Sequence, residues 1–138
     1  MGTAEVVIIT DTSVWVELLR GTGDQTAMAL KGLISRGKDV RVPDIVFMEL
    51  LAGASSEIQA RDLQGRLMSF PVVQLRGLAD FESAASLYRA CRRAGETIRK
   101  MTDCLVSIAA MRIGGHLLHK DRDFDAIARH SPLQIYQL

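Results

Sequence analysis

Short apolar segments alternate with amphipathic stretches along most of the chain. Five of the apolar segments have the length of strands, at residues 6–10, 40–42, 71–75, 116–119 and 133–136. Several are continuous apolar runs rather than alternations of apolar and polar residues, which is typical of strands covered on both faces.

Apolar residues recur at helical spacing between these segments. The pattern predicts helices at about residues 15–21, 30–37, 44–53, 60–67, 78–88 and 102–113, several of them ending at glycine. Helices between successive strands act as crossover connections and favour parallel pairing. We therefore expect an α/β fold, a three-layer sandwich with a mainly parallel sheet of four or five strands, formed by residues 1–138 as a single domain.

The helix expected at 44–53 is apolar nearly all round, and such a helix is mostly buried. Glu49 is the only charged residue between Asp44 and Glu57. An ionised carboxylate in that setting costs several kcal/mol unless it is paired with a cation or hydrogen-bonded. Glu49 is therefore either one half of an internal ion pair with an arginine or a metal ligand.

Four further acids occupy places where strands end or helices begin. Asp11 follows the first strand, Asp103 opens the helix at 102–113, and Asp121 and Asp123 follow the strand at 116–119. Each alone is explained by a turn, a helix cap or the helix dipole. In an open parallel sheet, however, sites form beyond the carboxyl ends of the strands.

Acids that converge at one sheet edge oppose folding unless a cation neutralises them. Oxygen ligands without thiols or paired histidines select Mg²⁺ or Mn²⁺ rather than zinc. The only cysteines, Cys91 and Cys104, lie in apolar helical stretches, and we expect reduced, structural thiols. The acids therefore predict a magnesium or manganese site.

Overall charge and hydropathy limit the possible partners of the chain. Its 17 basic and 16 acidic residues nearly cancel, but setting four metal-bound acids aside leaves an excess of five positive charges, which suits a polyanion. No apolar run approaches the roughly 20 residues that span a bilayer, and no signal peptide is evident. We expect a cytoplasmic protein that does not bind membranes.

Taken in order, four segments resemble the PIN-domain ribonucleases, and more closely the VapC-type toxins of bacterial toxin–antitoxin pairs. Any one of the segments is a weak signal, whereas the ordered set is specific and runs through nearly the whole chain. The segments are IITDTSVWV from Ile8, MELLAG from Met48, TDCL from Thr102 and HKDRDF from His119.

The resemblance implies a role for each matching residue. Asp11, Glu49, Asp103 and Asp121 match the acidic quartet of the family, and Thr12 or Ser13 matches the hydroxyl that supports the first acid. Asp123 remains an alternative to Asp121 as the fourth acid. One or two Mg²⁺ ions would assist hydrolysis of RNA to a 5′-phosphate and a 3′-hydroxyl, with Glu49 or Asp121 as the general base. A small antitoxin partner and a homodimer are implied as well.

Basic residues lie shortly before Asp103. They are either an ordinary solvated helix face or a rim that holds RNA phosphates, and the candidates for the rim are Arg92, Arg93, Arg99 and Lys100.

Three other functions compete with the nuclease. A receiver-like signalling domain needs paired acids after its first strand, where only Asp11 stands. A dehalogenase-like phosphatase needs an acid at the position of Ser13. A catalytically silent PIN-fold binding module is disfavoured by the intact acids.

Overall fold

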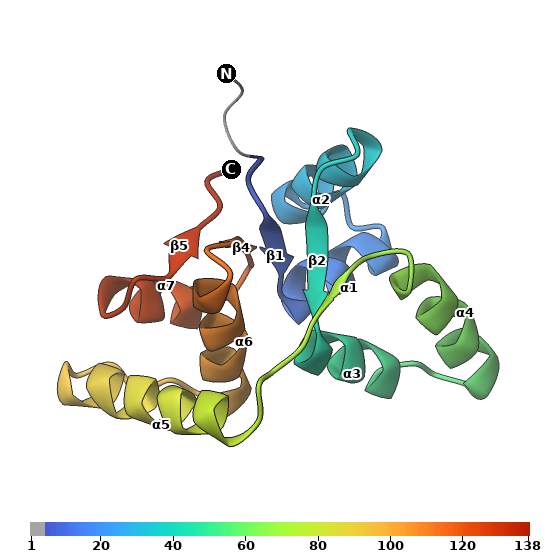
Figure 1. Cartoon of the computed structure of the whole chain (residues 1–138). Helices are drawn as coiled ribbons and strands as arrows, with labels where there is room; N and C mark the ends of the chain where they lie inside the picture. The colour runs from blue at the N-terminus through green and yellow to red at the C-terminus, as the bar shows by residue number, and fades with distance from the viewer. Residues whose placement is uncertain (1–4) are drawn as a thin grey trace.

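The computed structural model describes residues 5–138, which form a five-stranded sheet with helices packed against it (Figure 1). The strands are all parallel, in the order β3-β2-β1-β4-β5. The predicted α/β fold and parallel pairing are confirmed, although most strands are shorter than expected. Their bounds are β1 Ile8–Thr10, β2 Val40–Pro43, β3 Val72–Val73, β4 His116–Leu118 and β5 Gln134–Ile135.

Seven helices surround the sheet in the described residues. On one side, α2 and α3 both pack on α1. On the other side, α5, α6 and α7 pack on one another (Figure 1). All six expected helices are present, and α7 is an addition that the sequence pattern did not predict. Their bounds are α1 Thr12–Arg20, α2 Gln25–Ser35, α3 Asp44–Ala52, α4 Glu57–Leu67, α5 Leu78–Arg93, α6 Met101–Arg112 and α7 Arg122–Arg129.

The order of the strands reverses between β1 and β4. From β1 the chain proceeds to β2 and β3 on one side, and it returns to place β4 and β5 on the other side. In parallel sheets a crevice opens beyond the carboxyl ends of the strands at such a reversal. Asp11 directly follows β1 and Asp121 lies three residues after β4, so both border this crevice.

A buried hydrogen-bond chain fixes the start of α1 against the sheet. The indole nitrogen of Trp15 donates to the hydroxyl of Thr10 at 2.7 Å, and that hydroxyl donates to the carbonyl of Arg41 in β2 at 2.9 Å. The Trp15 ring also meets the ring of Phe70 edge-on, with centroids 5.3 Å apart. Because α1 is anchored in this way, the position of Asp11 at its N-terminus is well determined.

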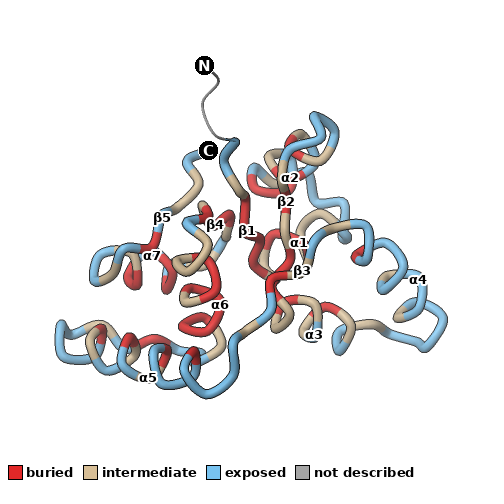
Figure 2. Tube along the Cα trace, viewed as in Figure 1, coloured by how far each residue is buried: buried red, intermediate tan, exposed pale blue. Residues whose placement is uncertain are grey.

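The helix α3 is less buried than its sequence predicts. Only Val46 and Leu50 are buried, whereas Met48 is 59% exposed. In Figure 2 most of α3 has the colours of intermediate and exposed residues. The expectation of a mostly buried helix was wrong, because Met48 and Ala52 stay exposed although α3 packs on α1, α4, α6, β2 and β3. When every position of a helix is apolar, the sequence does not show which side chains the rest of the protein covers and which stay at the surface.

Two other expectations concern cysteine chemistry and membranes. Cys91 and Cys104 are free and buried, which confirms their structural role, and burial raises the pKa of Cys104 to about 12. Within residues 5–138 no helix is both long enough and apolar enough to cross a membrane. The N-terminal residues 1–4 of the expected domain lie outside the described part of the chain.

The close approach of β1 and β4 depends on Gly115. A Cβ atom at Gly115 would lie 2.6 Å from Cγ1 of Ile9, a side chain with no exposed surface. We expect Gly115→Ala to lower the free energy of unfolding by about 1–3 kcal/mol, the usual effect of overpacking a core. Urea denaturation monitored by circular dichroism measures this change.

The matched control is Gly65→Ala in α4, where an added Cβ meets nothing within 4 Å. It should raise stability by about 0.5–1 kcal/mol, because alanine favours helix over glycine. A Gly115→Ala variant as stable as the native chain would contradict this account of the strand contact.

Candidate functional site

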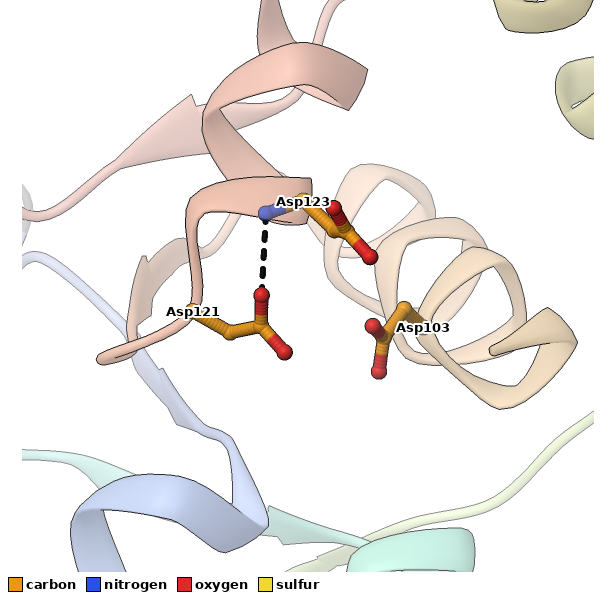
Figure 3. A group of neighbouring side chains, drawn as sticks. All are labelled: Asp103, Asp121 and Asp123. Atoms are coloured by element: carbon orange, nitrogen blue, oxygen red, sulfur yellow. Dashed lines mark hydrogen bonds between the residues drawn. The ribbon is translucent and has the colours of Figure 1, made fainter. Parts of the chain in front are cut away.

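Three aspartates meet near the carboxyl ends of β1 and β4. Asp103, Asp121 and Asp123 each offer a carboxylate oxygen, and these oxygens lie within 4.8 Å of one another. Figure 3 shows the carboxylates of Asp121 and Asp103 facing each other, with Asp123 reaching toward them from the start of α7. Three separate positions in the sequence therefore deliver oxygen ligands to one small volume.

Asp103 is the most unusual of the three. It lies in the first turn of α6, is 3% exposed, and its Oδ2 is buried without a hydrogen-bond partner in the described residues. Burial first, and then the negative charge of Asp11, raise the pKa of Asp103 to about 7, while Lys100 opposes the shift. A buried oxygen with no partner at the N-terminus of a helix can accept either a proton or a cation.

Asp121 and Asp123 are held together by Arg99. Its Nη2 donates to Asp121 Oδ1 at 2.7 Å, and its Nε and backbone N each donate to Asp123 Oδ2 at 3.0 Å. Asp121 also caps α7, accepting from the backbone N of Asp123 at 3.0 Å. Burial alone would raise the pKa of Asp123, but the hydrogen bonds from Arg99 outweigh it and lower that pKa below its usual value.

Asp11 borders the cluster from the end of β1. It is 5% exposed and caps α1, with Oδ2 accepting from the backbone N of Ser13 at 3.1 Å and from the Ser13 hydroxyl at 2.6 Å. That hydroxyl in turn accepts from the backbone N of Lys120 at 3.0 Å. Ser13 therefore connects the loop after β1 with the loop after β4, and both loops carry acids.

Glu49 lies on α3 and is half-buried. Its Oε1 accepts a hydrogen bond from the Thr12 hydroxyl at 2.7 Å. No salt bridge to Glu49 is found in residues 5–138, so the expected alternative of an ion pair with an arginine does not occur there. Glu49 and Thr12 also line an open groove between α1, α3 and α4, whose walls include Val16, Leu50 and Leu63.

The structure brings the predicted residues together unequally. Asp103, Asp121 and the alternative acid Asp123 form the tight group, and Asp11 acts on Asp103 through its charge. Glu49 is not part of the tight group in residues 5–138. The predicted supporting hydroxyls both bind acids, since Ser13 binds Asp11 and Thr12 binds Glu49.

The four predicted RNA-binding residues differ in their surroundings. Arg92, Arg93 and Lys100 are exposed, in the last turn of α5 and at the start of α6. Arg99 is already engaged by Asp121 and Asp123, a contact that sequence reasoning missed. No spacing signal could reveal it, because Arg99 lies 22 and 24 residues from those two acids.

Comparison with known proteins gives close relatives by sequence. Ribonuclease VapC11 of Mycobacterium tuberculosis is 39% identical over 129 residues, covering 93% of this chain and 96% of the relative. A VapC ribonuclease of Mycobacterium bovis matches to the same extent.

Solved structures share the fold at lower identity. The VapBC2 structure from Rickettsia felis, bound to promoter DNA, matches with a TM-score of 0.74 and 15% identity, covering 96% of this chain and 99% of that one. A toxin–antitoxin complex from Klebsiella pneumoniae matches with a TM-score of 0.68 and 19% identity, over 93% and 99% of the two chains.

The family model of the PIN domain matches residues 8–130, a range that includes the tight group of aspartates together with Asp11 and Glu49. This range is most of the chain, and it agrees with the identity to the VapC ribonucleases over nearly their whole length. The chain belongs to the PIN domain family.

Proposed function

We propose that this chain is a cytoplasmic, metal-dependent endoribonuclease, the toxin of a toxin–antitoxin pair, acting through a carboxylate-bound Mg²⁺ or Mn²⁺ as a single nuclease domain. The observation that carries the proposal is the buried, unpartnered Oδ2 of Asp103 beside Asp121 and Asp123. The names of its VapC relatives support the ribonuclease activity.

The residues present fit a divalent cation. The donors are carboxylate oxygens from Asp103, Asp121 and Asp123, and no thiol lies in this group. Asp11 is near enough for its charge to raise the pKa of Asp103. Such a donor set suits magnesium or manganese. Glu49 enters the proposal through the family resemblance, and its contact with Thr12 orients it from the side of α3.

When bound, the cation would neutralise charge on a phosphate oxygen and lower the pKa of an attacking water. The contribution of the chain is to hold the acids in place. Ser13 fixes one oxygen of Asp11, while the backbone N of Asp123 fixes one oxygen of Asp121, so that each acid keeps its other oxygen for a ligand. Glu49 or Asp121 is the proposed general base.

RNA phosphates would be held by basic side chains near the acids. Lys100 directly precedes the first turn of α6, which contains Asp103, and its charge already acts on that carboxylate. Arg92 and Arg93 precede the loop that leads to it. We propose these three as phosphate contacts.

An antitoxin partner is proposed from the surface beside the site. The groove between α1, α3 and α4 has apolar walls and reaches Thr12 and Glu49. Leu19 and Met48 leave 48% and 59% of their surface exposed on two of the helices that form it. A partner segment lying there would approach the acids and block RNA. A homodimer belongs to the same proposal, on the family resemblance.

The second candidate, a catalytically silent PIN-fold module, is disfavoured by the same acids. A silent module would have no need for a buried carboxylate without a partner, because such a group lowers stability and no bound metal would compensate for it. The match to the PIN domain model over residues 8–130 argues against the receiver-like alternative.

Asp103 makes the stability of the metal-free protein depend on pH. The folded chain holds the Asp103 proton up to about pH 7, whereas an unfolded aspartate releases it near 3.8. The folded state binds more protons in this window, so stability falls as pH rises through it, by about 1.4 kcal/mol per pH unit. We expect Asp103→Asn to gain up to about 3 kcal/mol over the native chain between pH 5 and pH 7.

Urea denaturation in EDTA, repeated at several pH values, measures this difference. Saturating Mn²⁺ should flatten the pH dependence of the native chain and leave Asp103→Asn little changed. Parallel pH profiles for the two proteins in EDTA would rule the account out.

Removing the carboxylate of Asp11 or of Asp103 should abolish RNA cleavage without unfolding the chain. We expect Asp11→Asn and Asp103→Asn to reduce the cleavage rate by at least about 100-fold, because each removes a charged metal ligand. The assay uses total RNA with Mg²⁺ or Mn²⁺, maps the product ends, and includes EDTA. Glu82→Gln, an exposed acid of α5, is the matched control.

Native circular dichroism together with near-normal cleavage by Asp11→Asn or Asp103→Asn would refute the nuclease proposal. Products without a 5′-phosphate would refute the proposed chemistry while leaving RNA cleavage itself intact.

Basic side chains that bind phosphates should be visible in the salt dependence of RNA binding. In the Asp11→Asn background, we expect the pair Arg92→Gln and Arg93→Gln to weaken binding to single-stranded RNA. The slope of log affinity against log salt should fall by about 0.7 for each phosphate that the variant no longer neutralises. Filter binding across a salt series measures it, with Arg61→Gln on the distant helix α4 as the control. An unchanged slope would count against the basic rim.

A further inference from the structure

Arg99 connects two of the three acids of the tight group. It belongs to the loop between α5 and α6, four residues before Asp103, and its guanidinium reaches the loop after β4. Its guanidinium group binds two different carboxylates: Nη2 donates to Asp121 at 2.7 Å and Nε donates to Asp123 at 3.0 Å. The backbone N of Arg99 adds a third bond, to Asp123 Oδ2 at 3.0 Å.

The contacts of Arg99 leave one oxygen of each acid available. They fall on Asp121 Oδ1 and Asp123 Oδ2, and no hydrogen bond to the other oxygen of either residue is found in residues 5–138. In Figure 3 the second oxygen of Asp121 points toward Asp103. Arg99 therefore binds Asp121 without occupying the oxygen that faces the unpartnered Oδ2 of Asp103, and it leaves Oδ1 of Asp123 without a hydrogen bond in the described residues.

We propose that Arg99 is a positioning residue of the metal site. It holds Asp121 and Asp123 in the orientation that a divalent cation needs, instead of contacting RNA. This inference rests on the proposed metal-dependent function. It also assigns a role to each acid after β4, since Asp121 faces Asp103 directly while Asp123 serves as the second anchor of Arg99.

The positive charge of Arg99 opposes metal binding, whereas its hydrogen bonds favour it by orienting the ligands. A cation beside a metal site repels the metal, so this effect alone would make removal of Arg99 tighten metal binding. The guanidinium side chain is 57% exposed, however, and water and salt screen its charge. Loss of a residue that orients metal ligands typically weakens metal binding 10- to 100-fold. The orienting effect is therefore expected to dominate.

The test measures Mn²⁺ binding by calorimetry in the absence of RNA, on the full chain. Arg99→Gln should weaken Mn²⁺ binding by about 10-fold or more. Arg99→Lys should lie between Arg99→Gln and the native chain, because lysine keeps the charge but lacks the fork that reaches both carboxylates. Arg61→Gln, an exposed arginine of α4, should leave the affinity unchanged.

The variants retain one anchor of the loop, since the backbone N of residue 99 still donates to Asp123. Circular dichroism verifies that each is folded. Unchanged or tighter Mn²⁺ binding by Arg99→Gln would overturn the inference, and unchanged Mn²⁺ binding with weaker RNA binding would make Arg99 an RNA contact. A native chain that binds no Mn²⁺ would overturn this inference together with the proposed function.

Discussion

The burial of the Asp103 carboxylate beside other acids is the constraint that organises the carboxyl edge of the sheet. Its Oδ2 has no partner in the described residues, and Asp11, Asp121 and Asp123 all add negative potential around it. A protein domain is stable by only about 5–15 kcal/mol, so an uncompensated charge there would use a large part of that margin. The fold therefore requires a proton or a cation at this position. Because either a proton or a cation can neutralise Asp103, the stability of the fold depends on the same position that would bind the metal.

Helix capping and site formation are performed by the same side chains. Asp11 caps α1 and Asp121 caps α7, and in each case the capping bonds fall on one carboxylate oxygen. The other oxygen stays free for a ligand, while the cap fixes the rotamer. Asp11 and Asp121 can therefore each act as a helix cap and as a ligand at the same time. Asp103 differs, because it lies inside the first turn of α6 and does not cap that helix.

The sequence predicts the fold well, whereas the structure brings only some of the predicted acids into the tight group, namely Asp103 and Asp121 with the alternative Asp123. Strand positions and six helices follow from apolar periodicity, but α7 is only two turns long and its acids are equally typical of a turn. The burial of α3 was overestimated, because hydrophobicity alone does not say which face the chain itself covers. The contact of Arg99 with Asp123 joins residues 24 apart, so only the packed loops bring the two together. Likewise, the sequence left open the choice between Asp121 and Asp123, which depends on which oxygens Arg99 engages.

The distribution of cations explains how a nearly neutral chain can hold an acidic cluster and still attract a polyanion. Lys120 is occupied by Glu17 and Asp24, each at 3.1 Å, so it balances acids on α1 and at the start of α2 rather than the cluster. Arg99 balances Asp121 and Asp123 from within. Lys100 at the N-terminus of α6, and Arg92 and Arg93 in the last turn of α5, remain exposed. If the internal pairs cancel and a divalent cation neutralises the rest, exposed residues such as these, together with Arg122 beside the acids, set the field that an approaching phosphate meets. Arg92 and Arg93 would therefore recruit the substrate without building the site, whereas Lys100 serves both purposes, because its charge also lowers the pKa of Asp103.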